Sequence, residues 1–304
     1  MNCGICGNRG GEEKGYHRAC LKAFFGSPIL PEITLKLSDV SLEAQKMAGK
    51  ISISGVQPKL VLSLDKKCLV TIPPGGLFIL KPQTGAFHNL PENENACMNI
   101  AGRLGITVPP HGLFELADGT WAYIVRRFDR ISPAERKRCE DFSQILGLDK
   151  YAGSIEQVGR KILELSEFPG IDAQLLFERV LLNFLLGNGD AHLKNYSILE
   201  DDRGNLRLSP AYDIVCSKLV IPDEEDSALA INGKRNRIGR IDFEVLSDYL
   251  RIPDKASADI FRRMSRIREM TAAEIDHSLL EDEDKEVLLA IVEERFSRLY
   301  RAHL

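Results

Sequence analysis

The spacing of apolar residues changes near residue 130, and this change constrains the fold more than any other feature of the chain. Residues 60–64, 68–72 and 77–81 are short runs rich in β-branched and other apolar residues, separated by turn residues. Such runs are typical of antiparallel strands. Beyond residue 130 apolar residues recur every three or four positions, and the second half of residues 171–186 is nearly apolar all round, which predicts a buried helix. The sequence therefore predicts an α+β fold with a small β-rich lobe followed by a helical lobe.

The 304 residues are long enough for two lobes that each have their own core. We expect residues 1–30 to form an N-terminal segment with cysteine and histidine, residues 31–129 the β-rich lobe and residues 130–304 the helical lobe. Further helices are expected at residues 41–50, 92–104, 139–146 and 155–165 and within residues 257–304.

Asp190 and Asn195 lie five positions apart, directly after the predicted buried helix. This is the spacing of a protein-kinase catalytic loop, in which the aspartate accepts the proton of the substrate hydroxyl and the asparagine holds a magnesium ion. Asp and Asn are common in loops, so the spacing alone is weak evidence. His192 changes charge near neutral pH and is a possible base or ligand, but we expect it to be a structural or phosphate-contacting residue.

Two regions of the chain supply the remaining parts of a nucleotide site. Lys81 ends an apolar strand and can direct its ammonium group at phosphates, and either Glu92 or Glu94 is placed to hold that lysine. Asp213 follows a probable hairpin and adds a second carboxylate of the kind that Mg²⁺ prefers. Because Lys81, Glu94, Asp190, Asn195 and Asp213 come in the order found in kinases, the sequence predicts phosphate transfer.

A Ser/Gly-containing turn, residues 52–59, precedes the first predicted strand, where a phosphate-covering loop belongs. It contains one glycine and matches neither a Walker loop nor the three-glycine lid of ordinary kinases. Its serines, Ser52 and Ser54, are candidates for contact with phosphate or for phosphorylation, and a plain turn is the alternative. Residues 233–240 form the only dense cationic cluster in the sequence, either a solvated face or a contact site for DNA or an anionic substrate.

Composition limits the classes of partner. A net charge of -4 gives no field suited to general nucleic-acid binding, so we expect no direct contact with nucleic acid except through a local patch or a partner. The apolar runs are too short to span a bilayer, and no leader pattern begins the chain. We therefore expect a cytoplasmic protein without a membrane partner.

The N-terminal segment carries three of the seven cysteines at metal-ligand spacing. Cys3, Cys6, His17 and Cys20 offer three thiols and one imidazole, which can close a tetrahedral Zn²⁺ site. Three ordinary cysteines and a histidine near a frayed terminus are the alternative. The cysteine distribution does not resemble a secreted disulfide framework.

Taken together, these segments resemble the HipA-like serine/threonine kinases, the toxin components of bacterial toxin–antitoxin modules. The resemblance covers about residues 50 to 215. Its matching stretches are residues 54–59, 78–82, 92–94, 125–130, 187–195 and 210–213.

The resemblance implies a two-lobed protein-kinase-like fold that uses ATP and Mg²⁺. By position it makes Asp190 the catalytic base and assigns magnesium to Asn195 and Asp213. It places residues 126–128 at the adenine and makes Ser52 or Ser54 the candidate site of autophosphorylation. The full set of nucleotide-binding residues that it implies is Ser54, Gly55, Val56, Gln57, Lys59, Lys81, Glu94, Arg126, Arg127, Phe128, His192, Lys194, Asn195, Tyr212 and Asp213.

The resemblance also carries expectations about partners. HipA-like chains have a longer region ahead of the Ser54 loop, so this chain looks like the shorter HipT type, in which a separate small protein supplies that subdomain beside a DNA-binding antitoxin. The implied substrate is a protein, typically an aminoacyl-tRNA synthetase. The alternatives are a zinc-stapled pseudokinase or regulatory binding protein, and a lipid or small-molecule kinase on a related fold.

Overall fold

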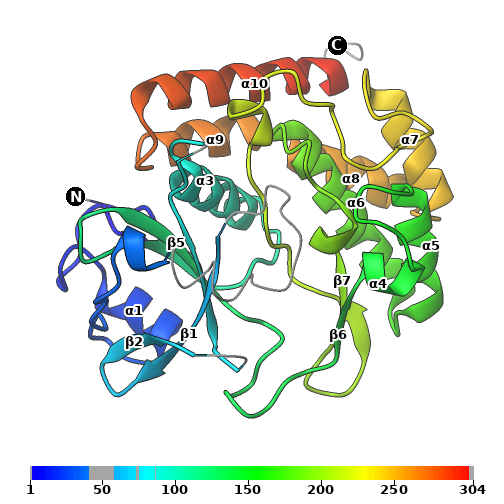
Figure 1. Cartoon of the computed structure of the whole chain (residues 1–304). Helices are drawn as coiled ribbons and strands as arrows, with labels where there is room; N and C mark the ends of the chain where they lie inside the picture. The colour runs from blue at the N-terminus through cyan, green and yellow to red at the C-terminus, as the bar shows by residue number, and fades with distance from the viewer. Residues whose placement is uncertain (1, 41–57, 73–74, 86, 301–304) are drawn as a thin grey trace. The chain divides into compact units, whose positions relative to one another are not determined.

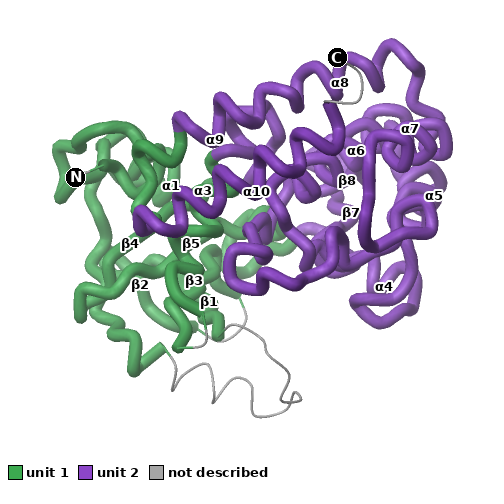
Figure 2. The backbone as a smooth tube through the Cα atoms, turned by 90° about the horizontal axis from the view of Figure 1, so that it is seen from above, with its two compact units in different colours: residues 1–99, 109–136, 274–280 green, residues 100–108, 137–273, 281–304 purple. Residues whose placement is uncertain are grey.

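The computed structural model describes residues 2–40, 58–72, 75–85 and 87–300. The helix expected at residues 41–50 lies outside this range. The described chain forms two compact units (Figure 2): unit 1 contains residues 1–99, 109–136 and 274–280, and unit 2 contains the rest. The three-part division expected from the sequence stays a prediction.

Unit 1 is built on a five-stranded antiparallel sheet in the order β2-β1-β3-β5-β4. Its strands are β1 (Leu60–Asp65), β2 (Cys68–Thr71), β3 (Phe78–Pro82), β4 (His111–Glu115) and β5 (Trp121–Arg126). Side chains alternate between the two faces of a strand. In β3, Phe78 and Leu80 are therefore buried on one face while Lys81 lies on the other.

Helix α1 (Arg18–Phe25) packs on the sheet through an aromatic cluster. The ring of Phe24 stacks on that of Phe78 at 5.5 Å between centroids, and Phe25 lies 5.3 Å from Phe114. Gly26 ends the helix with φ 78°, a conformation that favours glycine. The face of the sheet that carries Phe78 is thus closed by the N-terminal segment.

Unit 2 is mainly helical, and α6 is its buried centre (Figure 1). This helix, Pro169–Leu185, contacts α5, α7, α8 and α10, and its burial confirms the prediction for residues 171–186. The other helices that lie in unit 2 or reach into it are α3 (Leu90–Arg103), α4 (Phe142–Leu146), α5 (Ile155–Leu165), η1 (Leu193–Asn195), η2 (Ser217–Leu219), α7 (Arg240–Tyr249), α8 (Asp254–Met264), α9 (Ile267–Ile275) and α10 (Asp282–Tyr300).

A second antiparallel sheet lies in unit 2, in the order β6-β7-β8, with strands Cys139–Asp141, Ser197–Glu200 and Leu206–Leu208. The expectation of a helix from residue 139 is therefore wrong for its first three residues. They pair with β7, and Asp141 then caps α4 by accepting the Gln144 amide hydrogen bond at 2.9 Å. Among the described residues, no helix has both the length and the apolar character needed to cross a membrane.

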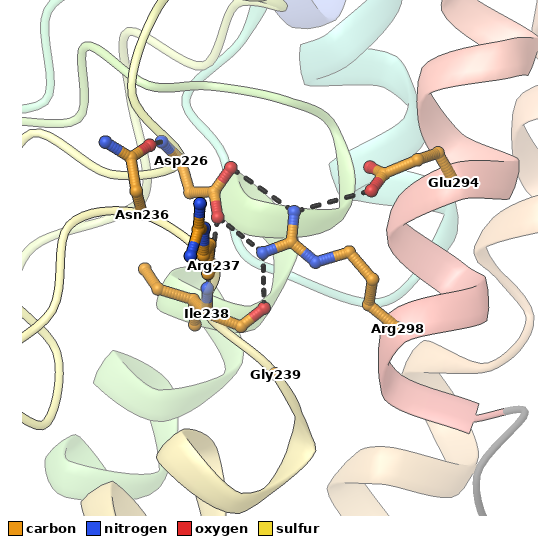
Figure 3. A pocket seen from close by; sticks show the side chains of 7 residues that line it. All are labelled: Asp226, Asn236, Arg237, Ile238, Gly239, Glu294 and Arg298. Atoms are coloured by element: carbon orange, nitrogen blue, oxygen red, sulfur yellow. Dashed lines mark hydrogen bonds and ion pairs between the residues drawn. The ribbon is translucent and has the colours of Figure 1, made fainter.

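Asp226 ties the end of α10 to the rest of unit 2. It accepts hydrogen bonds from the buried Arg295, from Arg298 at 2.5 Å and from the Ile238 amide at 3.1 Å. Figure 3 shows Arg298 directed at Asp226, at Glu294 and at the Ile238 carbonyl. Burial alone would raise the pKa of Asp226, but Arg298 and Arg295 together outweigh it and lower that pKa to about 2.

The cationic cluster at residues 233–240 lies beside this network and is largely paired with acidic neighbours. Lys234 contacts Asp242 at 2.8 Å, and Arg240 contacts Glu244 at 2.8 Å. This pairing favours the solvated-face interpretation over an anion site. None of the predicted nucleotide-binding residues that the structure describes lines the hollow drawn in Figure 3.

We expect Asp226→Asn to lower the free energy of unfolding of unit 2 by about 2–4 kcal/mol, because buried Arg295 loses its shortest carboxylate contact and keeps only the partly exposed Glu294 at 3.3 Å. Because the pKa of Asp226 is lowered by folding, ionised Asp226 stabilises the wild-type fold at pH values above about 4, the pKa of aspartate in the unfolded chain. This stabilisation is lost as the pH falls toward 2. Urea unfolding at pH 7 and pH 3 measures both effects. Exposed Asp223→Asn is the control, and equal stability of the two variants would contradict the assignment.

Candidate active site

The loop that carries Asp190 is held firmly at its first residues. Gly187 has φ 67°, and a side chain there would bring a Cβ within 2.7 Å of Ile291, so glycine is required. The Asn188 amide donates to the Asn183 carbonyl at 2.8 Å, and the two side chains share a further bond of 3.1 Å. The exit from α6 therefore has a defined geometry.

Gly189, the residue before Asp190, packs against backbone. Its amide donates to the Ser217 hydroxyl oxygen at 2.8 Å, and that hydroxyl donates to Glu224. A Cβ on Gly189 would lie 2.4 Å from the Glu225 carbonyl oxygen. Burial raises the pKa of Glu224, and the charge of Asp190 acts in the same direction.

Asp190 is oriented by a tyrosine from a distant part of the sequence. The Tyr151 hydroxyl donates to Asp190 Oδ1 at 2.8 Å, and the Tyr151 ring lies edge-on to His192 at 5.3 Å between centroids. Burial lowers the pKa of His192, so its imidazole is neutral near pH 7. The Tyr151 hydroxyl therefore fixes the orientation of the Asp190 carboxylate.

Asn195 and Asp213 lie side by side and are joined by a hydrogen bond. Asn195 Nδ2 donates to Asp213 Oδ2 at 3.0 Å, while Asn195 Oδ1 accepts the His192 amide at 2.9 Å. Asp213 has φ 60°, a sparsely populated conformation for a residue with a side chain. The backbone is thus bent where it brings this carboxylate to the loop.

Tyr212 joins the Asp213 segment to the same loop. Its hydroxyl donates to the Lys194 carbonyl at 2.8 Å and contacts the Ser197 hydroxyl at 2.5 Å. Burial raises the pKa of Tyr212, so it remains a neutral donor. Lys194 itself is exposed. Tyr212 therefore holds the backbone of the loop, and the nucleotide contact that the resemblance implies for it stays a prediction.

In unit 1, Lys81 and Glu94 form an ion pair. Lys81 Nζ lies 2.7 Å from Glu94 Oε1, and the two side chains are only 13% and 5% exposed. Glu94 lies in the first half of α3, where the sequence left Glu92 as an alternative. An ion pair between a strand lysine and a helix glutamate is a part that protein kinases need for activity.

The residues predicted to face adenine are Arg126, the last residue of β5, and the two residues that follow it. Arg127 binds Asp129 through two bonds of 2.9 and 2.6 Å, and its amide donates to the Leu77 carbonyl. The Arg126 amide donates to Pro110. The backbone of this segment is anchored, and the Arg127 guanidinium already has an acidic partner.

Some of the predicted site residues lie outside the part of the chain that the structure describes, and some residues that contact the Asp190 loop were not predicted. Five lie outside the described residues: Ser52, Ser54, Gly55, Val56 and Gln57. Lys59 is exposed just before β1. Tyr151, Ser217 and Glu224 had no signal in the sequence, because each is an ordinary residue that meets the loop only after folding.

Comparison with known proteins agrees with this geometry. The model of the HipA-like C-terminal domain family, HipA_C, matches residues 51–274. The chain belongs to this family. It is 32% identical over 200 residues to a putative kinase of Haemophilus influenzae, covering 61% of this chain and 58% of that protein.

HipA of Shewanella oneidensis, a serine/threonine-protein kinase toxin, is 28% identical over 255 residues, which are 74% of this chain and 57% of HipA. A chain in the solved complex of that organism's HipA, HipB and operator DNA superposes with a TM-score of 0.67 at 25% identity, over 82% of this chain and 65% of that one. This chain thus spans somewhat more than half the length of these relatives.

The proinflammatory kinase CtkA of Helicobacter pylori shares the fold, with a TM-score of 0.52 at 18% identity over 76% of this chain and 90% of CtkA. The predicted α+β, kinase-like fold and the HipA-like resemblance are both confirmed.

We expect Gly189→Ala to destabilise the chain by about 1–3 kcal/mol, because the added methyl group has no room beside the Glu225 carbonyl. Gly170→Ala, where a Cβ meets nothing within 4 Å, is the matched control and should be neutral or slightly stabilising. Chemical denaturation of both variants measures the difference. A Gly189→Ala variant as stable as the control would show that the loop is not packed as described.

Proposed function

We propose that this chain is an ATP-dependent serine/threonine protein kinase. The observation that carries the proposal is the Asn195–Asp213 pair beside the anchored Asp190 loop. Membership of the HipA-like family and the kinase names of its relatives support it. In the reaction, the oxygen of a protein hydroxyl forms a bond to the terminal phosphorus, and the bond from that phosphorus to the bridging oxygen of ADP breaks.

Asp190 accepts the proton of the attacking hydroxyl. Tyr151 is a positioning residue, because its hydroxyl fixes Oδ1 of Asp190 at 2.8 Å and leaves the other carboxylate oxygen for the substrate. Positioning is the main task here, since phosphoryl transfer needs little covalent chemistry from the protein.

Asn195 and Asp213 would hold Mg²⁺. The donor set suits this ion, because both side chains carry a hard oxygen ligand. Asn195 faces Asp213 through Nδ2 at 3.0 Å, and its Oδ1 accepts the His192 amide, so holding the ion would require the Asn195 amide to turn its oxygen toward Asp213. Mg²⁺ bound there would neutralise charge that develops on the phosphates. The strained backbone of Asp213 is consistent with a position selected for its carboxylate and not for stability.

Besides Mg²⁺, Lys81 would supply a positive charge to the phosphates of the nucleotide. Glu94 holds its ammonium group in a nearly buried position, so little conformational entropy remains to be lost when a phosphate binds. We propose that residues 126–128 contact adenine through their backbone, because the Arg127 side chain is already paired with Asp129.

The partners follow by analogy and are part of the proposal. HipA of Shewanella oneidensis was solved with HipB and operator DNA. We propose that this chain also assembles in the cytoplasm with small antitoxin subunits, one of which binds DNA, and that its protein substrate is an aminoacyl-tRNA synthetase. The net charge of -4 supports an indirect contact with DNA.

Asp190→Ala should reduce phosphate transfer by about 10²–10⁴-fold, because the general base is lost, while ATP affinity and the melting temperature stay near wild type. The assay incubates the chain with γ-labelled ATP and a bacterial lysate and counts label on protein bands. Exposed Asp223→Ala is the control. Full transfer by Asp190→Ala would exclude Asp190 as the base, and label on lipid or small molecules alone would exclude a protein kinase.

Self-phosphorylation should occur at Ser52 or Ser54, and the added charge of about -2 should repel the nucleotide phosphates and inhibit the enzyme. Mass spectrometry of wild type and Asp190→Ala tests this. Phosphate at either serine in wild type and none in the variant is the expected result. Phosphate on both proteins would mean that another kinase modifies the loop.

A further inference from the structure

The three thiols and the imidazole of the N-terminal segment gather at one point in unit 1. One ligand atom from each of Cys3, Cys6, His17 and Cys20 can be chosen so that all lie within 4.8 Å of one another. His17 Nδ1 lies 3.4 Å from the Cys6 sulfur and 3.9 Å from the Cys20 sulfur. In a tetrahedral zinc site with bonds of about 2.0–2.3 Å, neighbouring ligand atoms are about 3.5–3.8 Å apart. The observed separations bracket this range.

Local structure brings the ligands together in two pairs. The Gly7 amide donates to the Cys3 carbonyl at 2.8 Å, and the φ of 72° at Gly7 closes a tight turn around Cys3 and Cys6. His17 is the residue before α1, and Cys20 lies in the first turn of that helix. Residues three apart at the start of a helix share a face, so both side chains point to the turn.

We propose that this segment binds one structural Zn²⁺ through four side chains: His17 through Nδ1, and Cys3, Cys6 and Cys20 through sulfur. Three thiolates and one imidazole are the ligands that zinc prefers, and four protein ligands leave no open position for catalysis. A disulfide explains the cluster less well, because three cysteines cannot all pair among themselves and an imidazole would have no part in the bond.

The zinc ion would fasten the segment to the edge of the five-stranded sheet. The Leu113 amide of β4, an edge strand, donates to the Gly4 carbonyl at 2.8 Å, and the Tyr16 hydroxyl donates to the Leu113 carbonyl at 2.9 Å. A Cβ on Gly4 would lie 2.3 Å from that carbonyl oxygen. The segment thereby covers the edge of β4, and the metal would hold it there with Phe24 and Phe25 in the core.

The decisive experiment measures metal in the purified full chain. We expect about one zinc per chain by mass spectrometry of the elements, and the absorption bands of a tetrahedral cobalt–thiolate site when Co²⁺ replaces zinc. Cys6→Ser and Cys20→Ser should lose both signals, whereas Cys68→Ser, a half-buried cysteine of unit 1 outside the cluster, should keep them. Chelator should lower the melting temperature of wild type and Cys68→Ser.

Two results would overturn the proposal. One is wild-type protein, grown with added zinc, that contains no zinc and gives no cobalt bands. The other is undiminished zinc in both Cys6→Ser and Cys20→Ser. The wild-type measurements need no variant to fold, and none of these readouts depends on phosphate transfer, so the zinc site stands or fails separately from the kinase proposal.

Discussion

The hydrogen bond between Asn195 and Asp213 is the constraint on which the candidate site in unit 2 depends, because it joins two segments 18 residues apart. The first segment is a loop whose start is fixed by Gly187 and Gly189, and the second is bent by the positive φ of Asp213. Tyr212 ties the same segments together through the Lys194 carbonyl. Hydrogen bonds of this kind keep functional groups in place before a ligand arrives.

In unit 1 the two faces of the small sheet have different roles. One face carries the charge of Lys81, and the other packs against a hydrophobic core. The alternation in β3 puts Lys81 and Phe78 on opposite faces. Glu94 of α3 neutralises the lysine, and the aromatic residues of α1 cover the other face. The N-terminal segment therefore contributes to the core behind the lysine, and a metal that holds this segment would stabilise the position of β3 as well.

How much could be predicted from the sequence varies with the range of the interaction. The strands near Leu60 and Phe78 and the buried helix α6 follow from local periodicity, so they were predicted correctly. The strand Cys139–Asp141 was missed because three residues carry no usable pattern and pair only with β7. The sequence indicated that an acidic residue shortly after Lys81 would pair with it, but it left Glu92 and Glu94 as alternatives. Only the packed structure shows that the partner is Glu94. Tyr151 lies 39 residues from Asp190 and belongs to no motif, so only the structure reveals it.

The most direct test of the account is the magnesium dependence of ATP binding, measured by calorimetry for wild type and Asp213→Asn. Asparagine tolerates the left-handed backbone that position 213 adopts, so the variant removes the charge and keeps the fold. We predict that Mg²⁺ tightens ATP binding to wild type and that Asp213→Asn loses most of this gain. An equal gain in both proteins would contradict the assignment of Asp213 to the metal and with it the proposed nucleotide site.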